Sequence, residues 1–308
     1  MVSNYTGTGI ANPYGIAEGA DGALWFTNEA NGSIGRITTT GHVSNFTDPS
    51  ISHPTDIARG SDGAMWFTNL GNNTIGRITA AGVVWNYSDP TIAAPTGLAL
   101  GSDGALWFID YGRGTIGRIS PAGAVSAYAA GTAGLPQVIA AGPDGALWYT
   151  IGGTDDSVAR ITTGGVVTVF RDRSISSPQG IVTGPDAALW FTNTGFGGSI
   201  GRITPAGAVS NVPNLYGWRI AAGPDAALWV TQGDSIGRIT TGGVASSYSD
   251  PTISGALSGI AAGPDDAMWF TNSANNSIGR IAAGPVPSPP VCSESIRGSV
   301  RPRAAGGS

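Results

Sequence analysis

Few side chains in this sequence have the chemistry of a general base, a nucleophile or a metal ligand. The chain has two histidines, His42 and His53, and a single cysteine, Cys292. A histidine close to a carboxylate can accept a proton from a substrate near neutral pH. His53 lies in "SISHPTDIARG", three residues before Asp56, so we take it as the candidate base. The alternative for His53 is a solvated loop residue that precedes a proline.

The carboxylates that lie outside the repeated parts of the sequence are also few. Asp110 with Arg113 has the charges to orient a polar ligand, although an aspartate at this position can equally cap its own turn. Glu29 and the pair Asp155 and Asp156 are the other acidic candidates in loops. None of them forms a metal-ligand motif on its own.

A repeated phrase must position these side chains. "GALWFTNEANGSIGRI" at residues 22–37 returns as "GAMWFTNLGNNTIGRI" at 63–78 and "GALWFIDYGRGTIGRI" at 104–119. Its tryptophan occurs seven times, at Trp25, Trp66, Trp107, Trp148, Trp190, Trp229 and Trp269. Each copy contains four short apolar runs separated by Asp-Gly and similar turns, which is the pattern of antiparallel strands. The sequence therefore predicts an all-β, seven-bladed β-propeller with four-stranded antiparallel blades.

The two ends of the chain suggest how the ring closes. The seventh copy lacks an outermost strand, and "MVSNYT" at residues 1–6 matches the outer strand "HVSNFT" of the first copy. We expect the N-terminal strand to complete the last blade, since a closed ring leaves no long open edge. The expected domains are a propeller over residues 1–283 and a disordered Pro/Ser/Gly/Arg-rich tail over 284–308, which contains Cys292.

Arginine, aspartate and tryptophan recur in every copy. They form either a ring of ligands or structural links within each blade, and repetition in every blade favours the structural role. In three copies the glycine of the first turn is replaced, by Ala187, Ala226 and Asp266, which predicts a change of turn type there.

Positions that differ from copy to copy are better candidates for function. One set precedes the inner strand by two residues and comprises Tyr14, Thr55, Thr96, Gln137, Gln179, Trp218 and Ser258. A second set ends the second strand and comprises Asn28, Asn69, Asp110, Ile151, Asn193, Gln232 and Asn272. In a propeller both sets are expected at the same end of the ring, and we call them the first and the second ring. All members of the two rings except Thr55 and Ile151 form the predicted ligand-binding face.

Composition excludes several classes of partner. The net charge is −5 and no basic cluster occurs, which argues against nucleic acid. No apolar run reaches the length of a membrane-spanning helix. The N-terminus has no signal-peptide pattern, so we expect a cytoplasmic protein or a processed fragment of a secreted one. We expect a monomer with a small-molecule or peptidic ligand.

The repeat "GPDGALWFTN…NSIGRI", preceded by "P-x-G-I-A", resembles the virginiamycin B lyase family, also called streptogramin lyases, over about residues 1–283. The resemblance implies a magnesium-dependent enzyme that linearises streptogramin B cyclic depsipeptides by elimination across the ester, and so confers antibiotic resistance. It also implies histidines at the positions of Trp218 and Ser258, one of them acting as base. Metal-binding glutamates are implied at Ala256 and Asn272.

Two functions therefore remain open. In the first, the chain is an active magnesium-dependent streptogramin B lyase. In the second, it is a non-catalytic or diverged propeller that binds a ligand on the channel face. The four replaced positions favour the second, because an elimination needs a base and a cation or donors for the enolate oxygen. Magnesium is the expected cofactor only if the family activity is retained.

Overall fold

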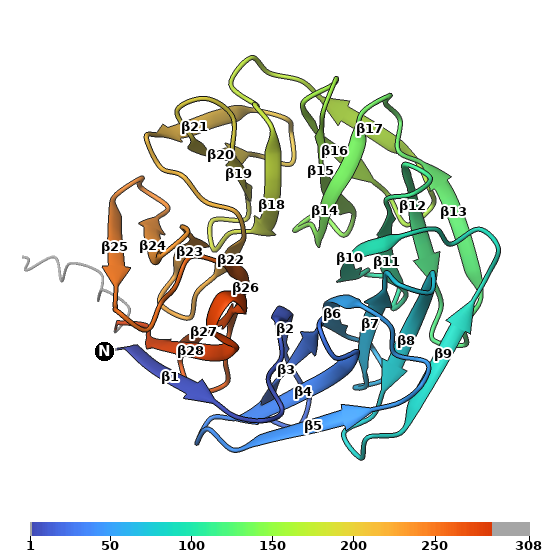
Figure 1. The fold of residues 1–308 in the computed structure, drawn as a ribbon. Coiled ribbons are helices and arrows are strands. Elements are labelled where there is room, and N and C mark those ends of the chain that lie inside the picture. Colours follow the sequence, from blue (N-terminus) through green and yellow to red (C-terminus); the bar gives the residue numbers. More distant parts are fainter. Residues whose placement is uncertain (1, 285–308) are drawn as a thin grey trace, which may run out of the picture.

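The computed structural model describes residues 2–284, so Met1 and residues 285–308, with the predicted disordered tail beyond Gly284, lie outside the described residues. Seven four-stranded antiparallel sheets surround a central axis (Figure 1), which confirms the predicted all-β propeller. No helix in the described range is long and apolar enough to cross a bilayer.

The strands follow one another from the inside of each blade to the outside. The first three blades are β2 (Pro13–Glu18), β3 (Ala23–Asn28), β4 (Ser33–Thr38) and β5 (Val43–Thr47); β6 (Pro54–Arg59), β7 (Met65–Asn69), β8 (Thr74–Ile78) and β9 (Val84–Ser88); and β10 (Pro95–Leu100), β11 (Leu106–Asp110), β12 (Thr115–Ile119) and β13 (Val125–Ala129). The next three are β14 (Leu135–Ala141), β15 (Leu147–Gly152), β16 (Ser157–Ile161) and β17 (Val167–Phe170); β18 (Pro178–Thr183), β19 (Leu189–Asn193), β20 (Ser199–Ile203) and β21 (Val209–Pro213); and β22 (Ile220–Ala222), β23 (Ala227–Thr231), β24 (Ser235–Thr240) and β25 (Ala245–Ser249). The last blade contains β26 (Leu257–Ala262), β27 (Ala267–Asn272), a short 3₁₀ turn η1 (Ser273–Asn275), β28 (Ser277–Ala282) and β1 (Val2–Thr6).

The N-terminal strand closes the ring, as the match between the two ends of the sequence predicts. Strand β1 runs antiparallel to β28, with Val2 opposite Ile281 and Thr6 opposite Ser277. The first and last parts of the chain therefore share one sheet, beside each other in Figure 1. This pairing satisfies the outer edge of β28 and joins the two ends of the ring.

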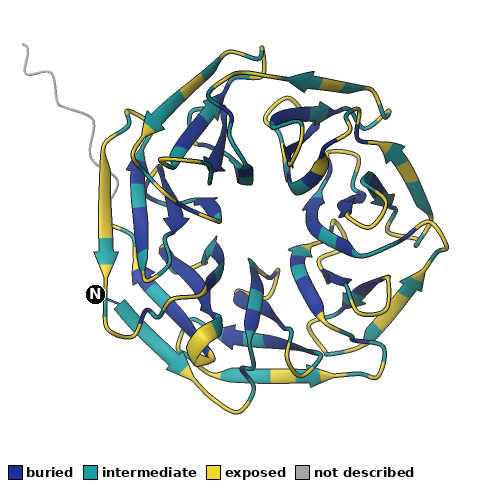
Figure 2. Cartoon of the chain, turned by 45° about the horizontal axis from the view of Figure 1, so that its top comes forward, coloured by how far each residue is buried: buried dark blue, intermediate teal, exposed yellow. Residues whose placement is uncertain are grey.

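The tryptophans are wedges between blades, which confirms their structural role. Trp25 is buried against Met65 and Phe67 of the next blade, and its ring stacks on Phe46 of its own blade at 5.3 Å. The middle strands of each blade are mostly buried, whereas the outer strands have intermediate and exposed residues and no buried ones (Figure 2). The hydrophobic core is thus divided among the blade interfaces.

Aspartate and arginine of the repeat link the strands of each blade. The indole N–H of Trp25 donates to Asp21 Oδ1 at 3.1 Å, and Arg36 Nε donates to Asp21 Oδ2 at 2.6 Å. The same two contacts recur in all seven blades, in the ion pairs Arg36–Asp21, Arg77–Asp62, Arg118–Asp103, Arg160–Asp144, Arg202–Asp186, Arg238–Asp225 and Arg280–Asp265. These charges are neutralised within each blade.

The residues that replace glycine in the first turn keep its left-handed backbone conformation, and at Ala187 the turn hydrogen bond is also kept, so the predicted change of turn type is wrong there. Ala187, Ala226 and Asp266 have φ of 55°, 55° and 53°, close to the 70° of Gly22. Ala187 N donates to Gly184 O at 3.1 Å, as Gly22 N donates to Gly19 O at 3.4 Å. The surrounding strand pairing therefore holds L-residues in the left-handed region.

Candidate ligand-binding site at the mouth of the ring

The structure brings the first ring together at one end of the central axis. We name two adjoining hollows there by a residue of each. The Trp218 cavity, about 290 Å³, is lined by Tyr14, Gln179, Trp218, Arg219, Gly233, Gly255, Ala256, Leu257 and Ser258. The Asp56 cavity, about 440 Å³, is lined by Tyr14, Glu29, Thr55, Asp56, Leu70, Thr96, Gly97, Tyr111, Gln137, Val138, Gln179 and Arg219. All seven first-ring residues line one hollow or both.

A bulge at the start of the inner strand positions these residues. In the first blade the pairing between β2 and β3 shifts between Pro13 and Ile16, so Tyr14 has no opposite partner in the ladder. Gly15 N instead donates to Thr27 Oγ1 at 2.9 Å, and Thr27 Oγ1 donates to Thr55 O of the next blade at 2.8 Å. The threonine of the repeated "WFT" therefore links neighbouring inner strands and fixes the backbone that carries the first ring.

The second ring has a different position from the first. Asn28, Asn69, Asp110, Asn193 and Asn272 are buried, with side chains no more than 2% exposed. Each accepts a hydrogen bond from a backbone N–H in the loop that enters its own blade, namely that of Ala11, Ser52, Ala93, Ser176 and Ser254. Gln232 is partly exposed and donates to Tyr216 O at 2.8 Å. The structure therefore places these side chains in loop contacts and outside both cavity walls.

Asp110 and Arg113 interact with the chain itself. Asp110 Oδ1 accepts from Ala93 N at 2.8 Å, and Arg113 Nη2 donates to Pro90 O at 2.6 Å. The guanidinium is 3.9 Å from the Asp110 carboxylate. Burial raises the pKa of Asp110, and its hydrogen bonds and Arg113 oppose this rise. The Asp110 carboxylate therefore holds the loop that enters its blade and does not cap its own turn.

The structure separates His53 from Asp56. His53 has φ of 43° and an exposed side chain in the loop before β6, and it is absent from the walls of both cavities. Asp56 lies in the cavity wall, where its carboxylate accepts hydrogen bonds from Ile57 N and Leu98 N at 2.9 and 2.8 Å. Burial raises the pKa of Asp56, while the charge of Arg219 and the two N–H groups oppose this.

Among the other acidic candidates, Asp155 pairs with Arg171 at 2.7 Å and Asp156 accepts from Ser177 N at 2.7 Å. Glu29 does line the Asp56 cavity, and it accepts a hydrogen bond from Asn12 Nδ2 at 2.8 Å. Of these candidates, Glu29 alone is therefore brought to the mouth.

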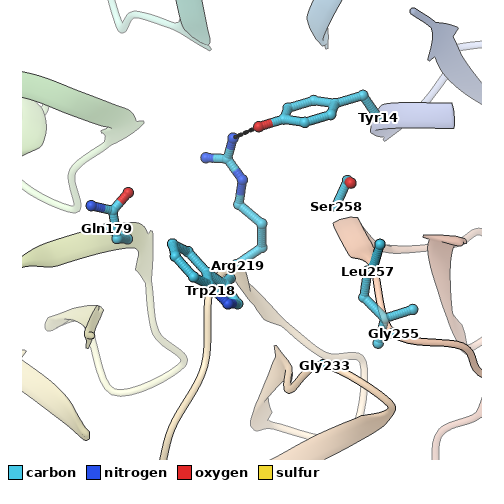
Figure 3. Close-up of a pocket in the computed structure, with 9 residues that line it drawn as sticks. Tyr14, Gln179, Trp218, Arg219, Gly233, Gly255, Leu257 and Ser258 are labelled. Carbon is cyan, nitrogen blue, oxygen red and sulfur yellow. Dashed lines mark hydrogen bonds between the residues drawn. The ribbon is translucent and has the colours of Figure 1, made fainter. Parts of the chain in front are cut away.

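Arg219 is the functional candidate that the ring analysis misses. Its side chain extends across the Trp218 cavity toward Tyr14 (Figure 3), and Nη2 donates to Tyr14 Oη at 3.5 Å. The signal was present one position after the first ring, where the copies read Gly15, Asp56, Gly97, Val138, Gly180, Arg219 and Gly259. Asp56 and Arg219 are the two charged residues at this position, where four other blades have glycine, and both line the mouth of the ring.

The residues at the implied metal-binding positions do not fit magnesium. Ala256 has no donor atom, and both atoms of the Asn272 amide are occupied, Oδ1 by Ser254 N at 3.2 Å and Nδ2 by Thr252 O at 2.8 Å. No cluster of three His, Cys, Asp or Glu side chains occurs within residues 2–284. Magnesium prefers carboxylates and water, and the Arg219 guanidinium in the same hollow would repel it. We therefore derive no step through a metal.

Comparison with known proteins identifies the same relatives by sequence and by structure. The profile of the virginiamycin B lyase family matches residues 2–134 and 128–297. Virginiamycin B lyase from Staphylococcus aureus is 30% identical with a TM-score of 0.84, and the match covers 92% of this chain and 99% of that one. A streptogramin B lyase is also 30% identical, with a TM-score of 0.83 and coverage of 91% and 96%.

A third structure, of a catalytically inactive histidine-to-alanine variant of the S. aureus enzyme with quinupristin, matches with a TM-score of 0.84 at 30% identity and covers 92% of this chain and 99% of its own. No curated protein matches the chain by sequence. The repeat, the closed ring of seven blades and these matches agree, and the chain belongs to the virginiamycin B lyase family.

Proposed function

We propose that this chain is a ligand-binding propeller that does not carry out the elimination of its relatives. The observation that supports this most directly is the wall of the Trp218 cavity. Trp218, Ala256 and Ser258 stand there where the family resemblance implies two histidines and a glutamate. No histidine, aspartate or glutamate is found among the described residues that line it. A base able to take the α-proton is therefore missing from the wall.

The remaining side chains suit the binding of a small or peptidic ligand. Trp218 is 46% exposed and meets Tyr216 edge to face at 5.9 Å, which offers an aromatic surface. Gln179 and Ser258 supply polar atoms, and Leu257 adds apolar area. Ser258 and Ser273 share a hydrogen bond of 2.6 Å, so the serine hydroxyl is held in place and is not activated by a base. Apolar walls with a few polar groups are typical of ligand sites.

The second candidate is an active, magnesium-dependent streptogramin B lyase that confers antibiotic resistance. Family membership and 30% identity over most of the chain favour it. A relative of this kind would need a base and metal ligands other than those at the matched positions.

One experiment separates the two functions. The purified protein is incubated with quinupristin, first with magnesium and then with a chelator, and the mixture is analysed by liquid chromatography with fragmentation. Elimination leaves the mass unchanged, so a shifted retention time with linear-peptide fragments would establish the lyase and contradict our proposal. We expect intact antibiotic at high protein concentration.

Ligand binding is then tested directly with Trp218→Ala and, as the matched control, Trp85→Ala. Trp85 is 44% exposed, but it lies on the outer strand β9. We expect quinupristin, or an aromatic N-acetylated amino acid used as a simpler probe, to bind the wild type and the Trp85 variant more tightly than the Trp218 variant. Equal binding by both variants would place the site elsewhere.

A further inference from the structure

Arg219 differs from the seven arginines of the repeat because it has no ion-pair partner among the described residues. Each of those arginines forms an ion pair with the turn aspartate of its own blade, for example Arg36 with Asp21 at 2.6 Å. Within residues 2–284 no carboxylate comes within ion-pair distance of Arg219, whose hydrogen bond to Tyr14 Oη is long at 3.5 Å. A guanidinium has five N–H donors, and most of those of Arg219 are therefore available to a ligand.

Most other blades have glycine at the position of Arg219, because neighbouring inner strands approach closely there. Gly15, Gly97, Gly180 and Gly259 occupy the equivalent position in four other blades. At Gly15 an added Cβ would lie 2.7 Å from Thr55 O, and at Gly259 it would lie 2.5 Å from Tyr14 O. The inner wall is thus closely packed, and Arg219 extends from it into the mouth, where it lines both cavities (Figure 3). A ligand that spans the two hollows must pass its guanidinium.

The surrounding charges limit what the guanidinium can bind. Asp56 faces Arg219 across a smaller hollow of about 100 Å³, and its two oxygens already accept N–H groups from Ile57 and Leu98. Glu29 adds a second carboxylate to the Asp56 cavity. With one cation and two acidic groups nearby, the mouth favours a monoanion over a dianion such as a phosphate ester.

We propose that Arg219 binds the carboxylate of the ligand in a two-pronged contact, while an aromatic or apolar part of the same molecule lies against Trp218. The planar fork of arginine matches the geometry of a carboxylate. Trp218 and Arg219 follow each other in sequence directly before β22, and both side chains line the same cavity. The ligand class is therefore an aromatic or peptide-like carboxylic acid. This inference rests on the proposed binding function.

The test compares N-acetyl-L-phenylalanine with its uncharged amide by protein NMR titration. We expect the wild type to bind the acid roughly tenfold or more tightly than the amide, because hydrogen bonds to charged groups are the stronger kind. Arg219→Gln should abolish this preference. Arg59→Gln, which removes an exposed arginine at the opposite end of inner strand β6, should keep it. Arg219→Lys keeps the positive charge but loses the planar fork, so it should retain part of the preference for the acid. It also tests the proposal if Arg219→Gln does not fold.

The possible results separate the two proposals. Equal binding of acid and amide by the wild type, or a preference that survives in Arg219→Gln, would overturn the role of Arg219 and leave the binding function standing. Tighter binding of phenyl phosphate than of the acid would overturn the choice of a carboxylate. Absence of binding by any probe at millimolar concentration would contradict both proposals.

Discussion

The contacts of Asp103 lead to a quantitative prediction about the repeated Asp-Trp-Arg unit. Its Oδ1 accepts the indole N–H of Trp107 at 3.2 Å, and its Oδ2 accepts Arg118 Nε at 2.7 Å. In Asp103→Ala the N–H of the fully buried Trp107 loses its acceptor, which costs about 1–3 kcal/mol. Arg118 is partly exposed and can rehydrate, so its lost ion pair adds only about 0.2–1 kcal/mol. We expect a total loss of about 1–4 kcal/mol in the free energy of unfolding.

Urea denaturation followed by tryptophan fluorescence measures this loss as a lower midpoint at an unchanged slope. Asp103→Asn keeps an oxygen for the indole but replaces the acceptor of Arg118 Nε with an NH2 group, so it should lose only the partly exposed arginine contact, about 1 kcal/mol or less. Asp234→Ala, at an exposed loop position, is the control and should change the midpoint little. If Asp103→Ala and Asp234→Ala have the same midpoint, the repeated unit does not stabilise the blades as we argue.

Three further predictions concern the repeat. Gly76→Ala would place a Cβ 2.1 Å from the Phe67 ring and should destabilise the fold by about 1–3 kcal/mol or more, whereas Gly164→Ala, with 3.7 Å to its nearest neighbour, should be nearly neutral in urea denaturation. Asn69→Ala leaves a loop N–H without its acceptor and should cost about 1–3 kcal/mol in the same assay, with cavity probes still bound. Burial alone would raise the pKa of the turn aspartates, but their arginine and tryptophan hydrogen bonds hold it below the usual value in Asp21, Asp62, Asp103, Asp144 and Asp186. A carboxyl group whose pKa is lower in the folded than in the unfolded state stabilises the fold at pH values above its unfolded pKa, near 3.8. The free energy of unfolding should therefore decline as the pH falls below about 4. Urea midpoints that stay constant from pH 6 to 3 would contradict this.

Much of the fold was predictable from sequence because every copy repeats the same local information. The Asp-Gly turn, the alternation in "ALWFTN" and the apolar "SIGRI" strand specify antiparallel strands with two buried faces. The match of "MVSNYT" to "HVSNFT" predicted the closure of the ring, since the two stretches occupy equivalent outer strands. The turn at Ala187 was misjudged, because strand pairing there holds an L-residue at a positive φ that L-residues otherwise avoid.

The candidate site was predicted in part. The first ring was located because each member stands at a fixed distance from an inner strand, and all seven members do line the cavities. The second ring was placed by the same spacing, but spacing along the chain does not say where a side chain points. Asn69 points back to its own entry loop, because its Oδ1 accepts from Ser52 N and its partner in the ladder is Pro54.

The sequence by itself determined the number of blades, their strands and the residues that hold each blade together. Its resemblance to the family also predicted that Trp218, Ser258, Ala256 and Asn272 stand at the positions of the family's histidines and glutamates. The tertiary structure decided which variable side chains meet. Tyr14 and Arg219 are 205 residues apart in sequence and touch only because the ring closes. Arg219 is free of the repeat's ion pairs for the same reason, since it projects toward the axis where the blades converge, and contacts of that kind depend on the whole ring.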